Sequence, residues 1–403
     1  MSGQLKRALG AAQEWPRVSG LVGGSLLAVL YLALRFESLQ GIGELVDHSP
    51  GLMKDFYDYF YRTGRSLGEG GGPVGGFLYP PLFGLLMVPF AWLSPRHAQF
   101  LWGALEALST LGLAALSARL APPRILWTTF ASLATIISTP ALHNFKWGQM
   151  GVPLALIALI AVEVYGRSRP LSALLISLSA SIKLYPAVLL SVFIRRRDFR
   201  SLVTCLAGGA ALIWGVPWLV LGQRRTARFF EKTGRFLTAT VDTTDPNSQS
   251  VANWMARMFG PVPDGVVLSL AASVAFFSAF LLLRARDVQS LTLDRFTAFL
   301  SLAWTPFVVP TSWANYFAFL PCFASFLAGQ AGTLQSRTLR TFVQMVAISV
   351  FLCGSFVAVD LCGNWAGYVG KGVLLAGNLA CAGTAMLILA VRDRDRLHPR
   401  HSS

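Results

Sequence analysis

The chain has 403 residues, of which 54% are hydrophobic and only 13% are charged, and it carries a formal net charge of +15. Soluble globular proteins average about 25% charged residues, so this composition leaves too few polar side chains to cover a surface that faces water. The basic residues lie in short clusters between apolar blocks, which excludes a nucleic-acid-binding protein and is typical of the cytoplasmic loops of membrane proteins.

The apolar blocks predict helices, because the backbone groups of a segment in lipid must be satisfied within the segment itself. The sequence predicts an all-α polytopic integral membrane protein that forms one domain over residues 1–403, with about 12 transmembrane helices of about 20 residues. In chain order, the predicted spans cover residues 18–36, 76–94, 98–118, 125–141, 152–165, 170–194, 201–221, 263–283, 295–311, 314–330, 341–359 and 368–391.

Clusters of Lys and Arg predict the orientation of these spans. The clusters consist of Lys6, Arg7, Arg17, Arg195, Arg196, Arg197, Arg200, Arg284, Arg286, Arg295, Arg337, Arg340, Arg392, Arg394, Arg396 and Arg400. The span count places all of them, and both termini, on the cytoplasmic side of a bacterial inner membrane. Two long loops, about residues 37–75 and 222–262, then face the outer side, where we expect the active site. Residues 142–151 fall on the cytoplasmic side by the same count, which indicates either broken helices that line a cavity or an error in the count at this point.

The first long loop carries carboxylates among aromatic residues, from Asp55 to Tyr61. Tyr and Phe can hold a loop at the membrane surface and stack on sugar rings, and a carboxylate can take the proton of an acceptor hydroxyl. The alternative is an interfacial helix whose acidic residues are solvated. Asp55 and Asp58 are both candidates for the base.

Lys183 lies within the predicted sixth span, followed by Tyr185 and Pro186. A lysine at this depth is costly unless it faces a cavity or a counter-charge, so it is a candidate for binding an anionic group such as a lipid phosphate. The structural alternative is that Lys183 pairs internally or reaches toward the membrane surface.

Four further polar and aromatic segments follow the predicted span ends: Tyr79–Leu82, His143–Gln149, Asn247–Arg257 and Ser312–Tyr316. Each of them alone fits a helix start, a loop or an aromatic turn, although amides can bind sugar hydroxyls and Arg can bind phosphate. The sequence contains no P-loop, HExxH or GxSxG motif and no Cys/His cluster with metal-ligand spacing. We therefore expect neither a metal nor a cofactor.

In their order and their placement relative to the spans, these segments resemble glycosyltransferase family 87, over about residues 50 to 320. The resemblance implies a GT-C fold and an inverting transfer of a sugar, with mannose as the expected one, from a polyprenyl-phosphate donor. The acceptor is a glycolipid or glycan at the outer face of the inner membrane, and the partners are lipids. Asp55 matches the catalytic aspartate, with Asp58 as its rival because the segment contains one extra residue before Thr63.

The resemblance also assigns the remaining site residues. It implies that the donor phosphate binds to Lys183, His143, Lys146 and Arg257. It implies that the substrates contact Tyr59, Tyr79, Gln149, Tyr185, Asn247, Gln249, Trp313 and Asn315. Asn315 stands where the family usually has His. Two other classes stay open: a transporter or lipid flippase, for which the sequence lacks the expected inverted repeats, and an assembly subunit, which would tolerate the loss of Asp55 and Lys183.

Overall fold

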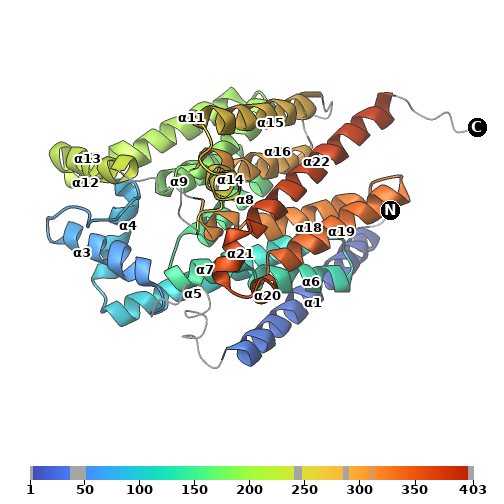
Figure 1. The fold of residues 1–403 in the computed structure, drawn as a ribbon, viewed down its shortest axis with the longest axis horizontal. Helices are drawn as coiled ribbons and strands as arrows, with labels where there is room; N and C mark the ends of the chain where they lie inside the picture. Colours follow the sequence, from blue (N-terminus) through green and yellow to red (C-terminus); the bar gives the residue numbers. More distant parts are fainter. Residues whose placement is uncertain (1–2, 37–50, 240–246, 285–289, 310–311, 398–403) are drawn as a thin grey trace, which may run out of the picture.

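Helices make up the fold in the computed structural model of the protein (Figure 1). The structure describes residues 3–36, 51–239, 247–284, 290–309 and 312–397. Within these ranges no β-strand forms, and the one isolated bridge joins Ser138 and Ser355. The prediction of an all-α protein is therefore confirmed. Residues 37–50 of the first predicted loop, with Glu37, Glu44 and Asp47, lie outside the described residues, as do residues 240–246 of the second.

The helical elements follow one another along the chain with short connections. They are α1 (Gly3–Arg35), the π-helix η1 (Phe56–Tyr61), α3 (Arg62–Gly68), α4 (Pro81–Ala91), α5 (Pro95–Leu120), α6 (Ile125–Ile136), α7 (Thr139–Trp147), α8 (Gly151–Val164), α9 (Arg169–Ile182), η2 (Tyr185–Leu189), α10 (Leu190–Arg195), α11 (Phe199–Ala210), η3 (Ala211–Gly215), α12 (Val216–Leu221), α13 (Gln223–Ala239), α14 (Val251–Phe259), α15 (Asp264–Arg284), α16 (Leu291–Ala303), α17 (Thr305–Val308), η4 (Ala314–Phe317), α18 (Leu320–Ala331), α19 (Arg337–Cys353), α20 (Phe356–Leu361), α21 (Trp365–Gly370) and α22 (Val373–Leu397).

Several helical segments have the length and composition of membrane spans. Among the described residues, five are long and apolar enough to cross a bilayer: Glu14–Arg35, Pro95–Leu120, Phe199–Leu221, Gly265–Arg284 and Trp365–Arg392. Apolar side chains stay exposed on them, including Leu34 at 79% and Leu219 at 86%, as expected for a surface that faces lipid. The protein is thus an integral membrane protein. The other predicted spans correspond to shorter helices, so the total of about 12 stays a prediction.

The predicted second span, residues 76–94, does not run through the bundle. Tyr79, before the first turn of α4, packs its ring 5.0 Å from that of Phe60 in η1. Leu93, just after α4, accepts a 2.8 Å hydrogen bond at its carbonyl oxygen from the hydroxyl of Tyr61 in the same short helix. Because both ends of α4 contact η1, α4 stays at one end of the bundle, and α5 is the helix that leads away from it (Figure 1).

The predicted sixth span, residues 170–194, is a helical hairpin rather than one helix. Arg169 at the start of α9 lies 3.7 Å from the carboxylate of Asp198, which follows α10. Tyr165, just before α9, donates a 2.7 Å hydrogen bond to the same carboxylate. The chain therefore runs out along α9, reverses at Lys183 to Tyr185, and returns along η2 and α10.

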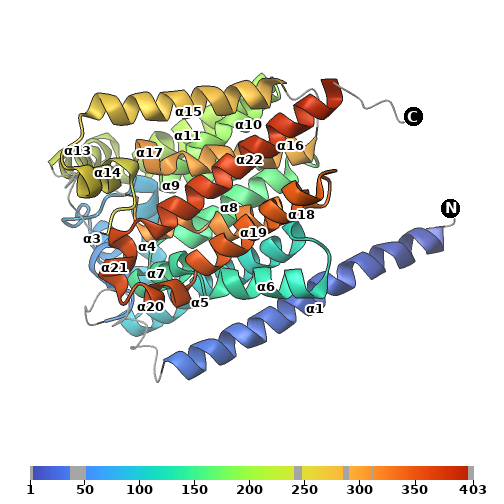
Figure 2. The same cartoon turned by 45° about the vertical axis from the view of Figure 1, so that its right-hand side comes forward.

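The two long predicted loops pack against each other, and the second one contains helices α13 and α14. Lys232 in α13 donates a 2.9 Å bond to the carbonyl oxygen of Pro73, and Arg225 donates one of 2.9 Å to that of Gly71. Figures 1 and 2 show α3, α4, α13 and α14 together at one end of the molecule. We call this the Asp55 end.

The basic clusters gather at the opposite end, which we call the basic end. Arg196 after α10 binds Asp294 in the first turn of α16, and the guanidinium of Arg392 in α22 lies 5.7 Å from the ring centre of Phe296. Figure 2 shows α1 beginning and α22 ending toward this end. Residues 142–151 lie at the Asp55 end instead, since Met53 donates its backbone N–H to the Lys146 carbonyl oxygen at 2.6 Å. The span count was therefore wrong at this point, because it treated residues 76–94 as a crossing.

Candidate active site

Helix α7 brings the predicted polar segment 143–149 to the Asp55 end. It begins at the N-cap Ser138, whose hydroxyl accepts from the backbone N–H of Ala141, and ends at Gly148 in the left-handed conformation (φ 68°). A Cβ on Gly148 would lie 2.7 Å from the Cβ of Phe56, so glycine allows η1 to approach this closely. The Gly148 carbonyl oxygen also accepts a 2.9 Å bond from the indole N–H of Trp102 in α5. The end of α7 is thus fixed against two other elements.

The short π-helix η1 positions Asp55. A π-turn contains one more residue per hydrogen bond than an α-turn, and such turns are rare and often lie at functional sites. The extra residue inferred before Thr63 therefore has a structural counterpart in η1. Phe56 anchors the helix by stacking on Trp102 at 5.0 Å, and Asp55 precedes the first turn.

A hydrogen-bonded chain links three predicted site residues. The side-chain amide of Gln149 donates to the carboxylate of Asp55, and its oxygen accepts a 2.7 Å bond from the hydroxyl of Tyr79. Tyr79 and Gln149 are buried, while Asp55 is partly exposed. Asp58 makes no hydrogen bond or ion pair with any residue that the structure describes. Of the two rival carboxylates, only Asp55 is held in this way within the described part of the chain.

The environment of Asp55 raises the pKa of its carboxyl group to about 6, chiefly because burial disfavours the charged form. The bond from Gln149 opposes this rise, the charge of Asp58 adds to it, and the charges of Lys183 and Lys54 oppose it. A carboxylate with this pKa is mostly ionised at neutral pH and is a stronger base than a solvent-exposed aspartate. The group is therefore suited to taking a proton from a hydroxyl.

Lys183 lies at the tip of the α9–α10 hairpin, in an extended conformation between the two helices. Its ammonium group lies 4.0 Å from the ring centre of Tyr316 and 5.4 Å from that of Tyr79. The ring of Tyr185 in turn packs 5.1 Å from that of Tyr316. These aromatic faces offset part of the cost of placing a cation here, and its charge acts on Asp55. A cation and a carboxylate thus meet at one point.

A second group surrounds His143. Its ring stacks on Trp365 in α21 with centroids 5.4 Å apart, and Trp365 donates a 2.8 Å bond from its indole N–H to the side-chain oxygen of Asn247. Burial lowers the pKa of His143 to about 3, and the charges of Lys146 and Lys183 lower it further. His143 is therefore neutral at physiological pH, so it can donate a hydrogen bond to a phosphate but cannot neutralise its charge. Asn247 and His143 come together here as neighbours of one indole.

Other predicted residues bind the protein itself. Gln249 is buried, donates its side-chain amide to the Val369 carbonyl oxygen at 2.8 Å and its backbone N–H to that of Ser312 at 2.7 Å. Arg257 donates a 3.0 Å bond to the carbonyl oxygen of Ser248. These contacts fasten the end of the second predicted loop to α21 and to the segment before η4.

The remaining predicted residues lie close to the first group. Tyr59 is partly exposed in η1, and Lys146 is fully buried with its ammonium 5.5 Å from the ring centre of Trp147. Trp313 precedes η4, in which the side-chain amide of Asn315 is fully buried and makes no hydrogen bond with the described residues. A Cβ on Gly151 would lie 2.5 Å from the Asn315 carbonyl oxygen, so η4 packs against the start of α8.

Two residues of these groups were missing from the predicted site. Tyr316 stands in the Ser312–Tyr316 motif, and its position next to a predicted outer turn was a usable signal. Trp365 lies between the last two predicted spans, where an aromatic residue alone suggested only a membrane-surface anchor. Within the described residues, no group of three or more His, Cys, Asp or Glu side chains is placed to hold a metal ion.

Comparisons with known proteins agree with this geometry. The model of glycosyltransferase family 87 matches residues 77–306, more than half of the chain and a range that includes Tyr79, Gln149 and Lys183 but begins after Asp55. A polyprenol-phosphate-mannose-dependent alpha-(1-2)-phosphatidylinositol mannoside mannosyltransferase of Mycobacterium tuberculosis is 29% identical over 346 residues, which cover 77% of this chain and 78% of that protein.

Two proteins of Mycolicibacterium smegmatis are also similar. One bears the same description and is 27% identical over 290 residues, which are 64% of this chain and 63% of that protein. The other, a polyprenol-phosphate-mannose-dependent alpha-(1-2)-phosphatidylinositol pentamannoside mannosyltransferase, is 33% identical over 166 residues, which are 39% of this chain and 38% of that protein. These matches favour an enzyme over the transporter and the assembly subunit. The chain belongs to glycosyltransferase family 87 and is a membrane glycosyltransferase.

Proposed function

We propose that the protein transfers a sugar, with mannose as the first candidate, from a polyprenyl-phosphate donor to a hydroxyl of a glycolipid acceptor. The observation that carries this proposal is the meeting of Asp55, held by Gln149, with the ammonium of Lys183 at the Asp55 end. The proposed donor and acceptor classes follow from the relatives, whose descriptions name polyprenol-phosphate-mannose and phosphatidylinositol mannosides.

In the proposed reaction, Asp55 takes the proton of an acceptor hydroxyl as its oxygen attacks the anomeric carbon. The bond between that carbon and the phosphate oxygen breaks, and the electron pair leaves with polyprenyl phosphate. Attack from the face opposite the phosphate inverts the anomeric configuration. Lys183 lies where its charge can stabilise the leaving phosphate, and the neutral His143 can donate a hydrogen bond to it.

The aromatic residues around this point suit a sugar. The rings of Tyr79, Tyr185 and Tyr316 form a wall beside Lys183, and Trp365 forms another beside His143. Sugar rings present apolar C–H faces that pack on aromatic rings, while their hydroxyls bind amides such as that of Asn315. The fully buried and unbonded amide of Asn315 is available for such a bond among the described residues.

The test is sugar transfer by the purified full-length protein in nanodiscs. Radiolabelled polyprenyl-phosphate mannose and arabinose are offered with phosphatidylinositol mannosides, and the product anomer is determined by NMR. We expect transfer of mannose with inversion, and none by an Asp55→Asn variant of unchanged thermal stability. Transfer of neither sugar by folded wild-type protein, or transfer with retention, would overturn the proposal.

We also propose that the Asp55 end faces the outer side of a bacterial inner membrane, with both termini cytoplasmic. Lys and Arg gather at the opposite end, as the positive-inside rule requires of the cytoplasmic face. Labelling of intact cells with a membrane-impermeant maleimide tests this. Arg62→Cys, exposed at the Asp55 end, should react, and Arg337→Cys, exposed at the basic end, should react only after lysis. Wild-type protein with its own free cysteines provides the background.

A further inference from the structure

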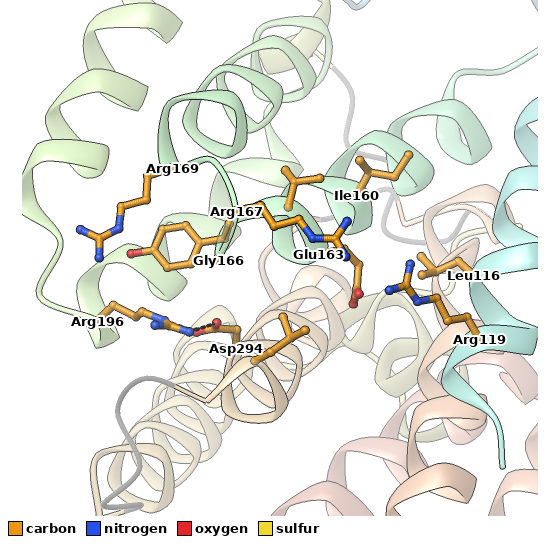
Figure 3. A pocket seen from close by; sticks show the side chains of 12 residues that line it. Leu116, Arg119, Ile160, Glu163, Gly166, Arg167, Arg169, Arg196 and Asp294 are labelled. Atoms are coloured by element: carbon orange, nitrogen blue, oxygen red, sulfur yellow. Dashed lines mark hydrogen bonds and ion pairs between the residues drawn. The ribbon is translucent and has the colours of Figure 1, made fainter. Parts of the chain in front are cut away.

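A second cavity lies at the basic end, between α5, α8, α9 and α16 (Figure 3). Its volume of about 480 Å³ lies within the range of ligand pockets. Helices α8 and α9 each have 14 residues, so each spans about 21 Å. Gln149 and Lys183 adjoin their far ends, whereas Glu163 and Arg169 line this cavity at their near ends. The cavity is therefore separate from the candidate active site.

The lining of this cavity has an excess of positive charge. Four arginines line it (Arg119, Arg167, Arg169 and Arg196), with only two carboxylates, Glu163 and Asp294. Both carboxylates already accept bonds from other arginines. Glu163 accepts two bonds of 2.6 Å from Arg295, and the fully buried Asp294 accepts bonds from Arg195 and Arg196. These pairs form a rigid floor that leaves no spare negative charge.

Arg119 and Arg167 are the two arginines whose charges this floor does not match. Neither makes a hydrogen bond or ion pair with any residue in the described part of the chain. Figure 3 shows them reaching toward Glu163 from opposite sides, Arg119 from the end of α5 and Arg167 from the turn before α9. Guanidinium groups that converge in this way match the geometry of a phosphate, which accepts paired N–H bonds from each fork.

The cavity also has an apolar side. Leu116, Ile160 and Leu291 line it, and Ile160 stays 38% exposed on the outer surface of the bundle. Ile194 and Phe199, beside the adjoining turn, are 60% and 68% exposed. A ligand with a phosphate headgroup and a hydrocarbon tail can thus meet arginines and apolar surface at once, and basic pockets between membrane helices bind such headgroups. We propose that this cavity binds the phosphate headgroup of an anionic phospholipid.

Native mass spectrometry of the full-length protein in detergent tests this proposal. Dioleoyl phosphatidylglycerol, dioleoyl phosphatidylcholine and inorganic phosphate are the three probes. The test variant is Arg119→Gln/Arg167→Gln. Its matched control is Arg124→Gln/Arg337→Gln, which removes two exposed arginines from the same end but outside the cavity. All four substituted residues are exposed, so the thermal unfolding midpoint should not change, and it is measured for each protein.

We expect one tightly bound phosphatidylglycerol per wild-type molecule, with retention that exceeds that of phosphatidylcholine. The test variant should bind phosphatidylglycerol about 30-fold more weakly, and the control variant should bind like wild type. Equal retention of the two lipids, or unchanged binding in the test variant, would overturn the proposal. Displacement of phosphatidylglycerol by millimolar inorganic phosphate would also overturn it, because the site would then be one for free phosphate.

Discussion

The side chain of Gln149 donates a hydrogen bond to the carboxylate of Asp55, although the two residues lie 94 positions apart in the sequence. This bond joins η1 in the first predicted loop to the turn that follows α7. It fixes one carboxylate oxygen while the Gln149 oxygen is engaged by Tyr79. The orientation of Asp55 therefore depends on three elements, so the candidate base is held in place before a substrate binds.

Replacing this carboxylate should abolish transfer, whereas replacing its rival should not. Asp55→Asn keeps the shape and can still bond to Gln149, but it cannot take a proton. We expect kcat/KM for sugar transfer to fall by about 10²–10⁴-fold. Asp58→Asn should retain activity within a few fold, because that side chain is not held by Gln149. Steady-state transfer assays with both variants provide the comparison, and a loss confined to Asp58→Asn would reverse the assignment.

The acid side of the pH profile should report Asp55. Because its pKa is raised to about 6 and the base must be ionised, kcat/KM should fall about tenfold per pH unit below pH 6. The bond from Gln149 favours the charged form, so Gln149→Leu should raise the pKa of Asp55 and move this fall to higher pH. The profiles of both proteins are measured with saturating donor. An unchanged profile in Gln149→Leu would show that another group titrates.

The sequence was sufficient to predict the helical class and most of the site residues, because both depend on local signals. Apolar block length identifies helices in lipid, and polar or aromatic segments between the blocks identify the region where substrates can bind. The motifs at Asp55, Tyr79, Gln149 and Lys183 are placed together by the structure, as their shared position at predicted span ends indicated.

The path of the chain could not be obtained in this way. Residues 170–194 form one apolar block of the length of a single span, yet they reverse direction at Lys183. That reversal depends on distant partners: the Tyr316 ring beneath Lys183 and the ion pair between Arg169 and Asp198. Similarly, α4 is as apolar as a span but is held at the Asp55 end by contacts with η1.

The lysine at this reversal should be needed for the departure of the phosphate. Lys183→Met keeps the length of the side chain but removes its charge, and we expect kcat to fall by about 10²–10³-fold. Tyr316→Ala removes the ring that lies 4.0 Å from the ammonium and should cost about 0.5–2 kcal/mol of transition-state stabilisation. Tyr316→Phe keeps the ring and is the matched control. Single-turnover rates distinguish these effects from weaker donor binding, and full activity of Lys183→Met would contradict the proposed role.

The buried carboxylate at the basic end should matter for stability rather than for chemistry. Asp294 is fully buried and accepts bonds from both Arg195 and Arg196, whose side chains are 6% and 7% exposed. Asp294→Asn would leave two buried positive charges without their counter-charge, and such changes lower the free energy of unfolding by about 3–5 kcal/mol. The control is Asp360→Asn, which breaks an ion pair with Arg35 whose partners are 43% and 39% exposed, and should cost at most about 1 kcal/mol. Unfolding in a titration with sodium dodecyl sulfate measures both variants. Equal losses in the two would mean that the buried arginines find other partners, whereas a loss confined to Asp294→Asn would establish this carboxylate as the point that joins the α9–α10 hairpin to α16.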